Sequence, residues 1–401
     1  MRVSVGVFFG GRSVEHEVSV ISAVQAMHAM DRTRYDVHPF YITKQGVFYT
    51  GQALMQIERY RDIPALLQEC TPVALLRREP GEVWAVRAQP KRFGGNDIAR
   101  LDVAFPIVHG TNTEDGSIQG MFESLLLPYV GSDVAASAIG MDKMVQKQVL
   151  AAAGLPVLDA LCFHTRDYVL REEATLDRIE RACGYPVIVK PVNLGSSVGI
   201  RVADDRNALR EAIDYAASYA PRLICERAVT ALREINCAVL GDAEETVTSL
   251  CEEPVMAGEI LSYADKYMSD GGKDSGMSGA QRRLPAELSG ELEQRIRTLA
   301  ADAFRAIGCG GVVRVDFLLD TAGGGEGVPY VNELNTLPGS LSYYLFAPAG
   351  LPYPELLDRL IDLAFKRQRE RDNLVFSYET NIFDGKQTGA LKGIKGAIKG
   401  G

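Results

Sequence analysis

The segment from Gly310 to Leu341, GGVVRVDFLLDTAGGGEGVPYVNELNTLPGSL, decides the fold of this chain. It contains two runs rich in β-branched residues, VVRVDFLL and VPYVNEL, in which apolar and polar side chains alternate. The glycine-rich stretch TAGGGEG lies between them, so the segment predicts a β-hairpin with its turn centred between Gly324 and Gly325. The bend TLPGS follows the second strand at once, which is typical of the rim of a site.

The register of this hairpin predicts one polar face. The turn places Asp316 opposite Glu333 and Arg314 opposite Asn335, and the period of two puts all four side chains on one face. The other face is apolar and carries Val313, Val315, Phe317, Val331 and Leu334. Two carboxylates and an amide are suitable oxygen ligands for a hard cation such as Mg²⁺, which nucleotide phosphates commonly share. We therefore expect a metal site at Asp316, Glu333 and Asn335, and the alternative is a solvent-exposed face held by salt bridges.

The composition excludes several classes of protein. The chain has 401 residues, of which 46% are hydrophobic and 24% charged, and this is typical of a soluble protein of two or three domains. The net charge of -9 argues against nucleic-acid binding, because the phosphate backbone requires a basic surface. Any anionic ligand must therefore be held by a local cluster of lysine, arginine and metal. Apolar runs stay shorter than the ~20 residues of a membrane span, so we expect no membrane insertion.

The cysteines and the first residues indicate a cytoplasmic protein. The seven cysteines are odd in number, scattered and never in CxxC spacing, which favours reduced thiols over a disulfide or zinc framework. The opening MRVSVGVFFGG is too short and too lightly charged for a signal peptide. It is typical of a first β-strand.

Residues 1–131 predict an α/β domain with a parallel sheet. The run VSVGVFF, a glycine turn and the segment EHEVSVISAVQAMHAM are typical of a strand, a turn and a helix, and VHPFYIT and LDVAFPIV continue the pattern. Ligands of such domains bind beyond the carboxyl ends of the strands, where GGRSVE and HGTNTEDGSIQG follow. A dinucleotide-binding fold is the alternative, but its GxGxxG motif is absent. Glu15, just inside the helix, either contacts a ligand or only interacts with the helix dipole.

The next part of the chain contains a candidate phosphate site. The segment SAIGMDKMVQKQVLAAAGLPV predicts a helix that carries Lys143. In PVIVKPVNLGSSVGIRV, a buried strand ends at Lys190, and a loop of glycine and serine leads into a second strand. Backbone N–H groups of such a loop can approach a phosphate, to which Lys190 adds a positive charge. The alternative is a tight hairpin with small residues, and the P-loop motif is absent.

Three further features complete the chain. The segment PRLICERAVTALREINCAVLG predicts a strand pair with Glu226 and Glu234 on it, and the polar, glycine-rich stretch from Asp270 to Ala280 is typical of a lid loop. The segment SGELEQRIRTLAADAFRAIG predicts an amphipathic helix. Its inward residues are Leu292, Ile296, Leu299 and Phe304. Residues 375–401 predict a flexible tail, with a weak basic contact to a partner or membrane surface as the alternative.

Taken in chain order, eight motifs resemble those of the D-alanine:D-alanine ligase family, which has the ATP-grasp fold. They are GGRSVEHEVS, HGTNTEDGSIQG, MDK, VIVKPVNLGSSVG, ERAV, ADKYMS, GGVVRVDFLL and NELNTLPGS. The resemblance extends from Val3 to about Arg371 and implies a three-domain protein of mixed α/β and α+β class. We predict the N-terminal parallel α/β domain at 1–131, the central domain at 132–226 and the C-terminal domain at 227–374, with ATP between the last two.

The resemblance also implies an activity. ATP would convert the carboxylate of one D-alanine into an acyl phosphate, and the amine of a second D-alanine would displace the phosphate. The products would be ADP, phosphate and the D-alanyl-D-alanine dipeptide used for peptidoglycan and hence for the cell wall. ATP would act with two Mg²⁺ or Mn²⁺ ions, and the enzyme would be a cytoplasmic homodimer without nucleic-acid partners.

Residue roles follow from the same resemblance. It implies that Lys143 and Lys190 hold the α- and β-phosphates. The other implied ATP-binding residues are Ser197, Glu226 on the adenine side, Glu234 on the ribose and Lys266 on the γ-phosphate. Asp316, Glu333 and Asn335 would bind the metal ions, in agreement with the hairpin register.

The implied amino-acid site uses other residues. Glu15 would pair with the ammonium of the first D-alanine, helped by His109, in a hydrogen-bonded set with Ser196 and Tyr267. Arg314 and the backbone N–H of Gly339 would hold the oxyanion of the tetrahedral intermediate. Ser342 and Tyr344 would lie beside the second substrate.

The chain departs from the family pattern at three places. Thr113 replaces a frequent glycine, and the lid sequence LSYADKY with the longer GGKDSGMSG lacks the usual aromatic run. Nine residues after Asn335, where the family often has a serine, this chain has Tyr344, with Ser342 two places earlier. The second substrate therefore stays open between D-alanine, D-serine, D-lactate and another amino acid. A nucleotide-binding regulator without turnover is the remaining alternative.

Overall fold

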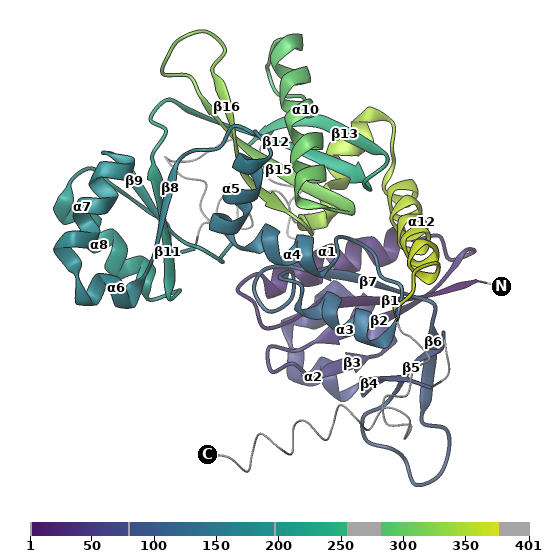
Figure 1. Ribbon diagram of the computed structural model, residues 1–401. Coiled ribbons are helices and arrows are strands. Elements are labelled where there is room, and N and C mark those ends of the chain that lie inside the picture. The colour runs from purple at the N-terminus through teal and green to yellow at the C-terminus, as the bar shows by residue number, and fades with distance from the viewer. Residues whose placement is uncertain (1, 79–80, 196–197, 255–281, 377–401) are drawn as a thin grey trace, which may run out of the picture. The chain divides into compact units, whose positions relative to one another are not determined.

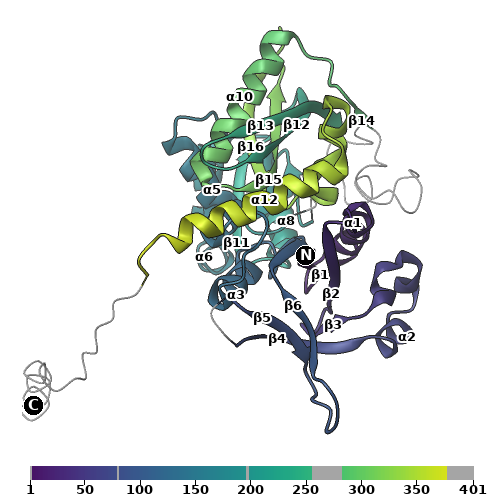
Figure 2. The same cartoon turned by 90° about the vertical axis from the view of Figure 1, so that its right-hand side faces the viewer.

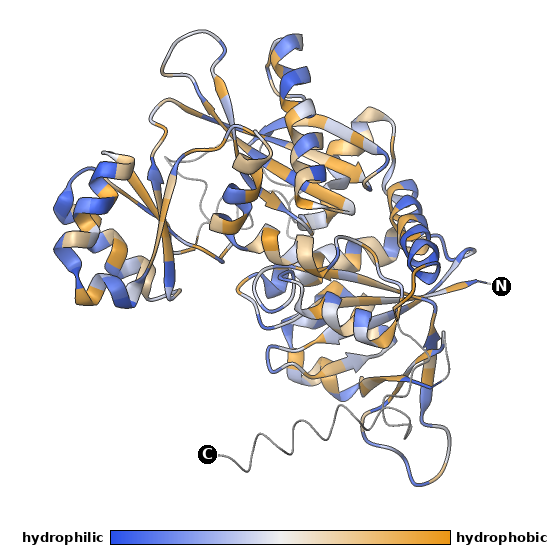
Figure 3. Cartoon of the chain, viewed as in Figure 1, coloured by the Kyte–Doolittle hydropathy of each residue, from blue (hydrophilic) through white to orange (hydrophobic). Residues whose placement is uncertain are grey.

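The structure, a computed structural model, describes residues 2–78, 81–195, 198–254 and 282–376 (Figure 1). The predicted lid loop from Asp270 to Ala280 and nearly all of the predicted tail lie outside the described residues. Residues 1–365 form one unit and residues 366–401 a second, and helix α12 (Tyr353–Asp372) begins in the first and ends in the second. Hydrophobic residues run along the strands, whereas the outer helices also carry hydrophilic ones (Figure 3).

A seven-stranded sheet, in the order β6-β5-β4-β3-β2-β1-β7, forms the first part of the chain. The strands are β1 (Val3–Gly10), β2 (Tyr35–Ile42), β3 (Phe48–Thr50), β4 (Thr71–Arg77), β5 (Val83–Arg87), β6 (Asp97–Leu101) and β7 (Val103–Val108). Strand β1 pairs in parallel with β2 and β7, as the sequence predicted. Strands β3 to β6 extend the sheet as an antiparallel meander, which Figure 2 shows side by side and which the sequence analysis did not anticipate.

The predicted strand, glycine turn and helix at the start of the chain are confirmed. Helix α1 (His16–Ala29) follows β1 and packs Ala23 and Met27 in the same core as Val5 and Val7. The helix begins at His16, one residue later than predicted, so Glu15 lies just before it. The remaining short elements of this part are η1 (Gln52–Met55), η2 (Ile57–Arg61), α2 (Ile63–Gln68) and α3 (Ser117–Leu125).

A second, four-stranded antiparallel sheet has the order β10-β9-β11-β8. Its strands are β8 (Ala160–His164), β9 (Val187–Pro191), β10 (Arg201–Ala203) and β11 (Arg222–Arg227). Helices α6 (Thr165–Leu170), α7 (Glu172–Cys183) and α8 (Arg206–Ala217) bury their apolar sides on this sheet. Lys190 and Glu226 therefore lie on neighbouring strands, β9 and β11.

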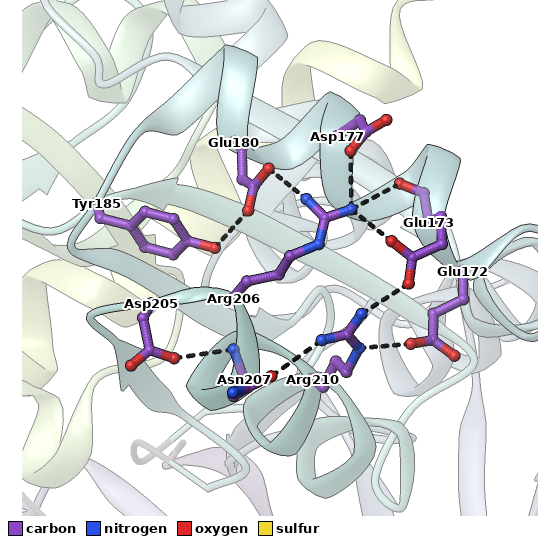
Figure 4. Close-up of polar contacts among 9 residues, drawn as sticks. All are labelled: Glu172, Glu173, Asp177, Glu180, Tyr185, Asp205, Arg206, Asn207 and Arg210. Atoms are coloured by element: carbon purple, nitrogen blue, oxygen red, sulfur yellow. Dashed lines mark hydrogen bonds and ion pairs between the residues drawn. The ribbon is translucent and has the colours of Figure 1, made fainter.

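Two arginines of α8 hold the acidic residues of α7 on the outer surface of this sheet's helices (Figure 4). The pairs join Arg206 to Glu173, Asp177 and Glu180, and Arg210 to Glu172 and Glu173, at 2.5–2.8 Å. Solvent screens such exposed pairs, so each contributes little alone. The network fixes α7 beside α8 and lies away from the pockets described below.

A third sheet, in the antiparallel order β14-β13-β12-β15-β16, contains the predicted hairpin. Its strands are β12 (Leu232–Gly241), β13 (Thr246–Pro254), β14 (Arg282–Arg283), β15 (Gly311–Asp320) and β16 (Val328–Asn335). Helices α4 (Val134–Met141), α5 (Lys143–Ala152) and α10 (Gly290–Ile307) share its apolar core. The predicted amphipathic helix is confirmed as α10, which buries Leu292, Ile296 and Phe304 and ends before Gly308 in a left-handed conformation.

The hairpin register is confirmed at the end of the strands that carries the polar side chains. Asp316 pairs with Glu333 and Arg314 with Asn335. Nearer the turn, the pairing shifts by one residue, because Phe317 pairs with Val331 and leaves Asn332 in a bulge. The predicted turn centre therefore holds for the polar end but not for the residues next to the turn.

Strand β16 lies at an edge of the third sheet, and its backbone is bonded to groups outside that sheet. The side chain of Gln146 in α5 accepts a hydrogen bond from the N–H of Leu334 (3.1 Å) and donates to the Leu334 carbonyl (3.4 Å). The N–H of Val331 donates to the carbonyl of Pro156 at 2.8 Å. These contacts fix the start of α5, and hence Lys143, against the hairpin.

The largest hydrophobic core joins parts of the chain that are distant in sequence. Residues Val5 and Phe9 of β1, Leu240 of β12 and Val312 of β15 share it with Leu345 of α11 (Tyr343–Phe346). The segments η4 (Gly339–Ser342) and η5 (Ala347–Ala349) flank α11. Packing thus crosses the predicted domain bounds, and those bounds remain predictions.

Within the described residues, none of the helices is both long and apolar enough to span a bilayer.

The buried face of α10 can be tested with Ile296→Ala. Ile296 is fully buried in the core of the third sheet, so we expect the substitution to lower the free energy of unfolding by about 2–5 kcal/mol. Gln294→Ala, at an exposed position of the same helix, is the control and should change it by less than about 0.5 kcal/mol. Equal effects of the two substitutions in urea denaturation would contradict the packing of α10.

Candidate active site

Two adjoining pockets bring the predicted residues together. Both are lined by Lys143, Leu194, Gly195 and Glu333. The larger pocket, about 930 Å³ including its open mouth, lies between strands β9 to β11 of the second sheet and β12, β15 and β16 of the third. Lys143 and Glu333 therefore stand where the two pockets meet.

Lys143 is positioned by the start of α5. The Asp142 carboxylate caps the helix by accepting from the N–H groups of Met144 and Val145, at 3.1 and 3.0 Å. The Lys143 ammonium donates to the Leu194 carbonyl (2.8 Å) and pairs with Glu333 (3.0 Å). It thereby joins the glycine loop after β9 to the hairpin.

Lys190 and Glu226 line the larger pocket from the second sheet. The Lys190 ammonium pairs with one Glu226 oxygen at 2.8 Å, and the other oxygen lies 3.0 Å from the ammonium of Lys147. Burial opposes the charge of Glu226, but the charges of Lys190 and Lys147 outweigh it and lower its pKa. The Glu226 carboxylate thus faces two lysines. Glu234, the predicted ribose residue, lines the same pocket.

The polar face of the hairpin is held together by charge. Arg314 donates two hydrogen bonds to Asp316, at 2.6 and 2.7 Å, and the Asn335 amide donates to Asp316 at 3.0 Å. Glu333 lies directly across the strand pair from Asp316 and is paired with Lys143. Each carboxylate thus has a cation at its oxygens. The ion pairs agree with the alternative interpretation, but the face is not solvent-exposed, because the side chains of Arg314 and Asp316 are only 9% and 15% exposed.

The same face also fits a metal ion. Among the described residues, no group of three or more His, Cys, Asp and Glu is arranged to hold a metal. The donor set consists of two opposed carboxylates and one amide, and oxygen ligands of this number suit Mg²⁺ when phosphate oxygens supply the rest. The oxygens of Asp316 and Glu333 already attract the cationic groups of Arg314 and Lys143, and a metal ion would take the place of these groups.

Glu15 lines the smaller pocket together with His109, Arg314 and Gly339. Its carboxylate is packed between two glycines. A Cβ placed on Gly110 or Gly195 would come within 2.7 and 2.9 Å of a Glu15 oxygen, so a side chain at either position would displace the Glu15 carboxylate. Glu15 stands at the N-cap of α1 without a side-chain capping hydrogen bond, and both interpretations, a ligand contact and an interaction with the helix dipole, remain predictions.

His109 is a buried structural link. Its Nδ1–H donates to the Leu337 carbonyl at 2.8 Å, and Nε2 lies 3.3 Å from the Ser22 hydroxyl, from which it accepts. Burial lowers its pKa to about 4, so it is neutral at pH 7. His109 therefore joins the loop after β7 to the bend after β16 and carries no charge to the pocket.

Glu114 is a site residue that the sequence analysis missed. Its carboxylate accepts from the N–H of Gly110 (3.0 Å) and from that of Leu337 (2.9 Å). Burial and the charge of Glu15 raise its pKa to about 7. The signal in the sequence was an acid within the tight turn HGTNTEDG. The neighbouring Thr113 fits because residue 11 is a glycine. A Cβ at Gly11 would lie only 2.3 Å from the methyl carbon of Thr113.

The bend after the hairpin has an unusual backbone. Ser340, Leu341 and Ser342 have φ values of 49°, 52° and 49°, in the left-handed region that non-glycine residues rarely adopt. The Ser340 N–H donates to the Ser22 hydroxyl (2.9 Å) and its hydroxyl donates to Gln25 (2.8 Å). Contacts with α1 thus support the strained turn that presents Gly339 to the smaller pocket.

Ser342 and Tyr344, the predicted second-substrate residues, are buried and line neither pocket among the described residues. The Tyr344 ring lies under the guanidinium of Arg282 at 4.0 Å, and its hydroxyl donates to Glu252 at 3.4 Å. Burial and the charge of Glu252 raise the pKa of Tyr344 to about 12. Ser196, Ser197, Lys266 and Tyr267 lie outside the described residues.

Three other residues of the site had not been predicted. Asn332 lines the larger pocket and accepts a hydrogen bond from Lys190 at 3.4 Å, because the bulge turns it to the same face as Glu333. In the sequence, the bulge at Asn332 is indicated by the spacing of three residues between the apolar Val331 and Leu334, which breaks the alternation of the strand. Lys147 and Gln146 follow Lys143 within one helical turn, and only the packing shows their partners.

Two sheets that enclose a lysine-lined pocket beside a hairpin with paired carboxylates define an ATP-grasp protein. Sequence profiles described as "D-ala D-ala ligase N-terminus" and "D-ala D-ala ligase C-terminus" match residues 4–132 and 149–362. The chain belongs to the D-alanine:D-alanine ligase family.

Individual relatives agree with this assignment. A D-alanine–D-alanine ligase of Geobacillus kaustophilus is 38% identical over 384 residues, which cover 94% of this chain and 99% of the relative. One of Chloroherpeton thalassium is 39% identical, over 92% of this chain and 97% of the relative. The solved D-alanine-D-alanine ligase of Coxiella burnetii has a TM-score of 0.74 and 31% identity, over 92% and 96% of the two chains. The VanG D-Ala:D-Ser ligase of Enterococcus faecalis has a TM-score of 0.74 and 29% identity, over 91% and 100%.

The raised pKa of Glu114 predicts a pH dependence of stability. Because its pKa rises from 4.5 to about 7 on folding, its stabilising contribution is complete below pH 4.5 and is lost as the pH rises through 7. In Glu114→Gln this loss is absent. The unfolding free energy of the wild type minus that of the variant should therefore fall by about 1–3 kcal/mol between pH 5 and pH 8.

Urea denaturation at four pH values measures this difference. Asp115→Asn, in the same loop, is the matched control and should keep the pH trend of the wild type. A difference between wild type and Glu114→Gln that stays constant or grows with pH would refute the shifted pKa.

Proposed function

We propose that this protein joins two D-alanine molecules into D-alanyl-D-alanine for peptidoglycan, with ATP converted to ADP and phosphate. One observation carries the proposal: Lys143 and Glu333 stand where two pockets meet, with Asp316, Arg314 and Asn335 beside them. A nucleotide in one pocket and an amino acid in the other would then meet at the carboxylates of the hairpin.

ATP would occupy the larger pocket. Lys143 and Lys190 would contact the α- and β-phosphates, and Glu234 the ribose, because all three line this pocket. Glu226 would lie on the adenine side through its backbone. Ser197 would add a contact from the glycine loop and Lys266 one to the γ-phosphate.

Asp316, Glu333 and Asn335 would hold two Mg²⁺ or Mn²⁺ ions together with phosphate oxygens. When bound, such ions neutralise the charge that develops as the γ-phosphoryl group is transferred. For this the carboxylates must exchange their present partners: Asp316 is bonded to Arg314, and Glu333 to Lys143. Both arginine and lysine would then be available to the substrates.

The first D-alanine would occupy the smaller pocket. The negative charge of Glu15 suits an ammonium group, and Ser196 and Tyr267 would complete its hydrogen-bonded set. Neutral His109 would act by holding the Leu337 carbonyl, and thus the bend, in place. The carboxylate of the substrate would point to the hairpin, where the γ-phosphate arrives.

The second step would attack the acyl phosphate with the amine of the second D-alanine. Negative charge develops on the carbonyl oxygen, and Arg314 with the backbone N–H of Gly339 would stabilise it as an oxyanion hole. Both line the smaller pocket. The strained turn at 340–342 fixes the backbone next to Gly339, which supports this role.

A different second substrate is the alternative function. Tyr344 lies in the core at the place where the family often has a serine, and the chain is similar to a ligase named for D-serine. D-lactate or another amino acid fits the same chemistry.

We also propose that the enzyme is located in the cytoplasm and forms a homodimer.

A product assay tests the proposal directly. With ATP, Mg²⁺ and D-alanine as the sole amino acid, the purified protein should release phosphate and form the dipeptide, detected by mass spectrometry. L-Alanine should give neither. Phosphate release that requires D-serine or D-lactate beside D-alanine would replace the cell-wall dipeptide by the alternative product.

Arg314→Ala separates binding from chemistry. We expect kcat to fall by about 100–1,000-fold, because the oxyanion loses a charged donor, whereas the Kd of ADP with Mg²⁺ changes by less than about threefold. Arg305→Ala, at an exposed site on α10, is the control and should keep kcat. Loss of ADP binding in Arg314→Ala, measured by calorimetry, would show that Arg314 serves the nucleotide instead.

A further inference from the structure

Lys147 is a buried lysine that the proposed reaction does not use. Its side chain is only 5% exposed, and it is not among the residues that line the larger pocket in the described part of the chain. It lies one helical turn after Lys143 in α5, and its ammonium is 3.0 Å from Glu226. A lysine is rarely buried without a paired charge, so its position requires an explanation.

Glu226 is shared by two lysines that differ in their access to the pocket. Lys190 approaches one carboxylate oxygen at 2.8 Å and also lies 3.4 Å from Asn332, which lines the pocket. Lys147, which belongs to α5 and does not line the pocket in the described part of the chain, lies 3.0 Å from the other oxygen. Glu226 thus has a cationic partner at each carboxylate oxygen, and of the two lysines only Lys190 lines the larger pocket.

This arrangement has a consequence for phosphate binding. A lysine that binds a phosphate must leave, or share, its carboxylate partner. If Lys190 were the only partner of Glu226, its departure would leave a buried carboxylate without a counter-charge, which is strongly unfavourable. With Lys147 in place, the carboxylate keeps a cation while Lys190 turns to the ligand.

We propose that Lys147 is a positioning residue: it is the permanent counter-ion of Glu226 and so frees Lys190 to bind a nucleotide phosphate. The inference rests on the proposed function, because it takes the larger pocket as the nucleotide site. It adds a role for a residue that contacts neither nucleotide nor amino acid.

The test compares ligands with and without phosphates. In Lys147→Met, Lys190 is held by Glu226, so the Kd of ADP should rise by about tenfold or more, whereas that of adenosine should change by less than about twofold. Lys147→Arg keeps the charge and should retain ADP binding. Gln148→Met, exposed on the same helix, is the matched control. Calorimetry on the full-length protein measures the Kd of ADP and of adenosine for the wild type and for each variant.

A second comparison shows whether Lys147 acts through Glu226. In a Glu226→Gln background the carboxylate charge is absent, so adding Lys147→Met should leave the Kd of ADP unchanged. This pair of variants leaves no buried carboxylate without a partner, and it serves as the test if Lys147→Met alone does not fold. An effect of Lys147→Met that is equally large in this background would overturn the proposal.

The remaining outcomes are also decisive. A parallel loss of ADP and adenosine binding in folded Lys147→Met would assign Lys147 a merely structural role and reject the inference. Wild-type protein that binds adenosine and ADP with equal affinity would reject the phosphate site itself, and with it the proposed function. Tight ADP binding in the wild type that Lys147→Met does not weaken would reject only the role of Lys147.

Discussion

The pairing of β15 with β16 is the constraint on which the site depends. It sets Asp316 opposite Glu333 and turns their side chains away from the apolar core of the third sheet. A shift of the register by one residue would exchange the polar and apolar faces. The bulge at Asn332 accommodates one extra residue near the turn. The pairing of Asp316 with Glu333 and of Arg314 with Asn335 is kept at the polar end of the hairpin.

Compensation of charge organises the surroundings of the hairpin. Asp316, Glu333 and Glu226 each have a cationic partner at 3.0 Å or less, drawn from β15, α5 and β9. Each partner is also a group that the proposed chemistry requires. Under the proposed function, these cations would wait as ion pairs, and ligand binding would exchange one partner for another without creating an unpaired buried charge.

Sequence reasoning succeeded where a local pattern determines the structure. The alternation around Asp316 and Glu333 gave the hairpin face, and the period of α10 gave its buried side. It failed where the partner is distant in the chain: Glu114 gains its role from the N–H of Leu337, and Lys147 from Glu226. The meander β3 to β6 was missed because its strands are only three to seven residues long, and such short strands give little sequence pattern.

The two hydrogen bonds between the Gln146 side chain and the backbone of Leu334 also affect the exposed edge of the third sheet. An uncovered sheet edge can recruit a strand from another molecule and start intermolecular aggregation. Here the amide of one glutamine occupies both backbone groups of Leu334, and the carbonyl of Pro156 occupies the N–H of Val331. A foreign strand is thereby hindered from pairing at Val331 and Leu334, so the contacts that hold α5 against the hairpin also shield this part of the sheet edge.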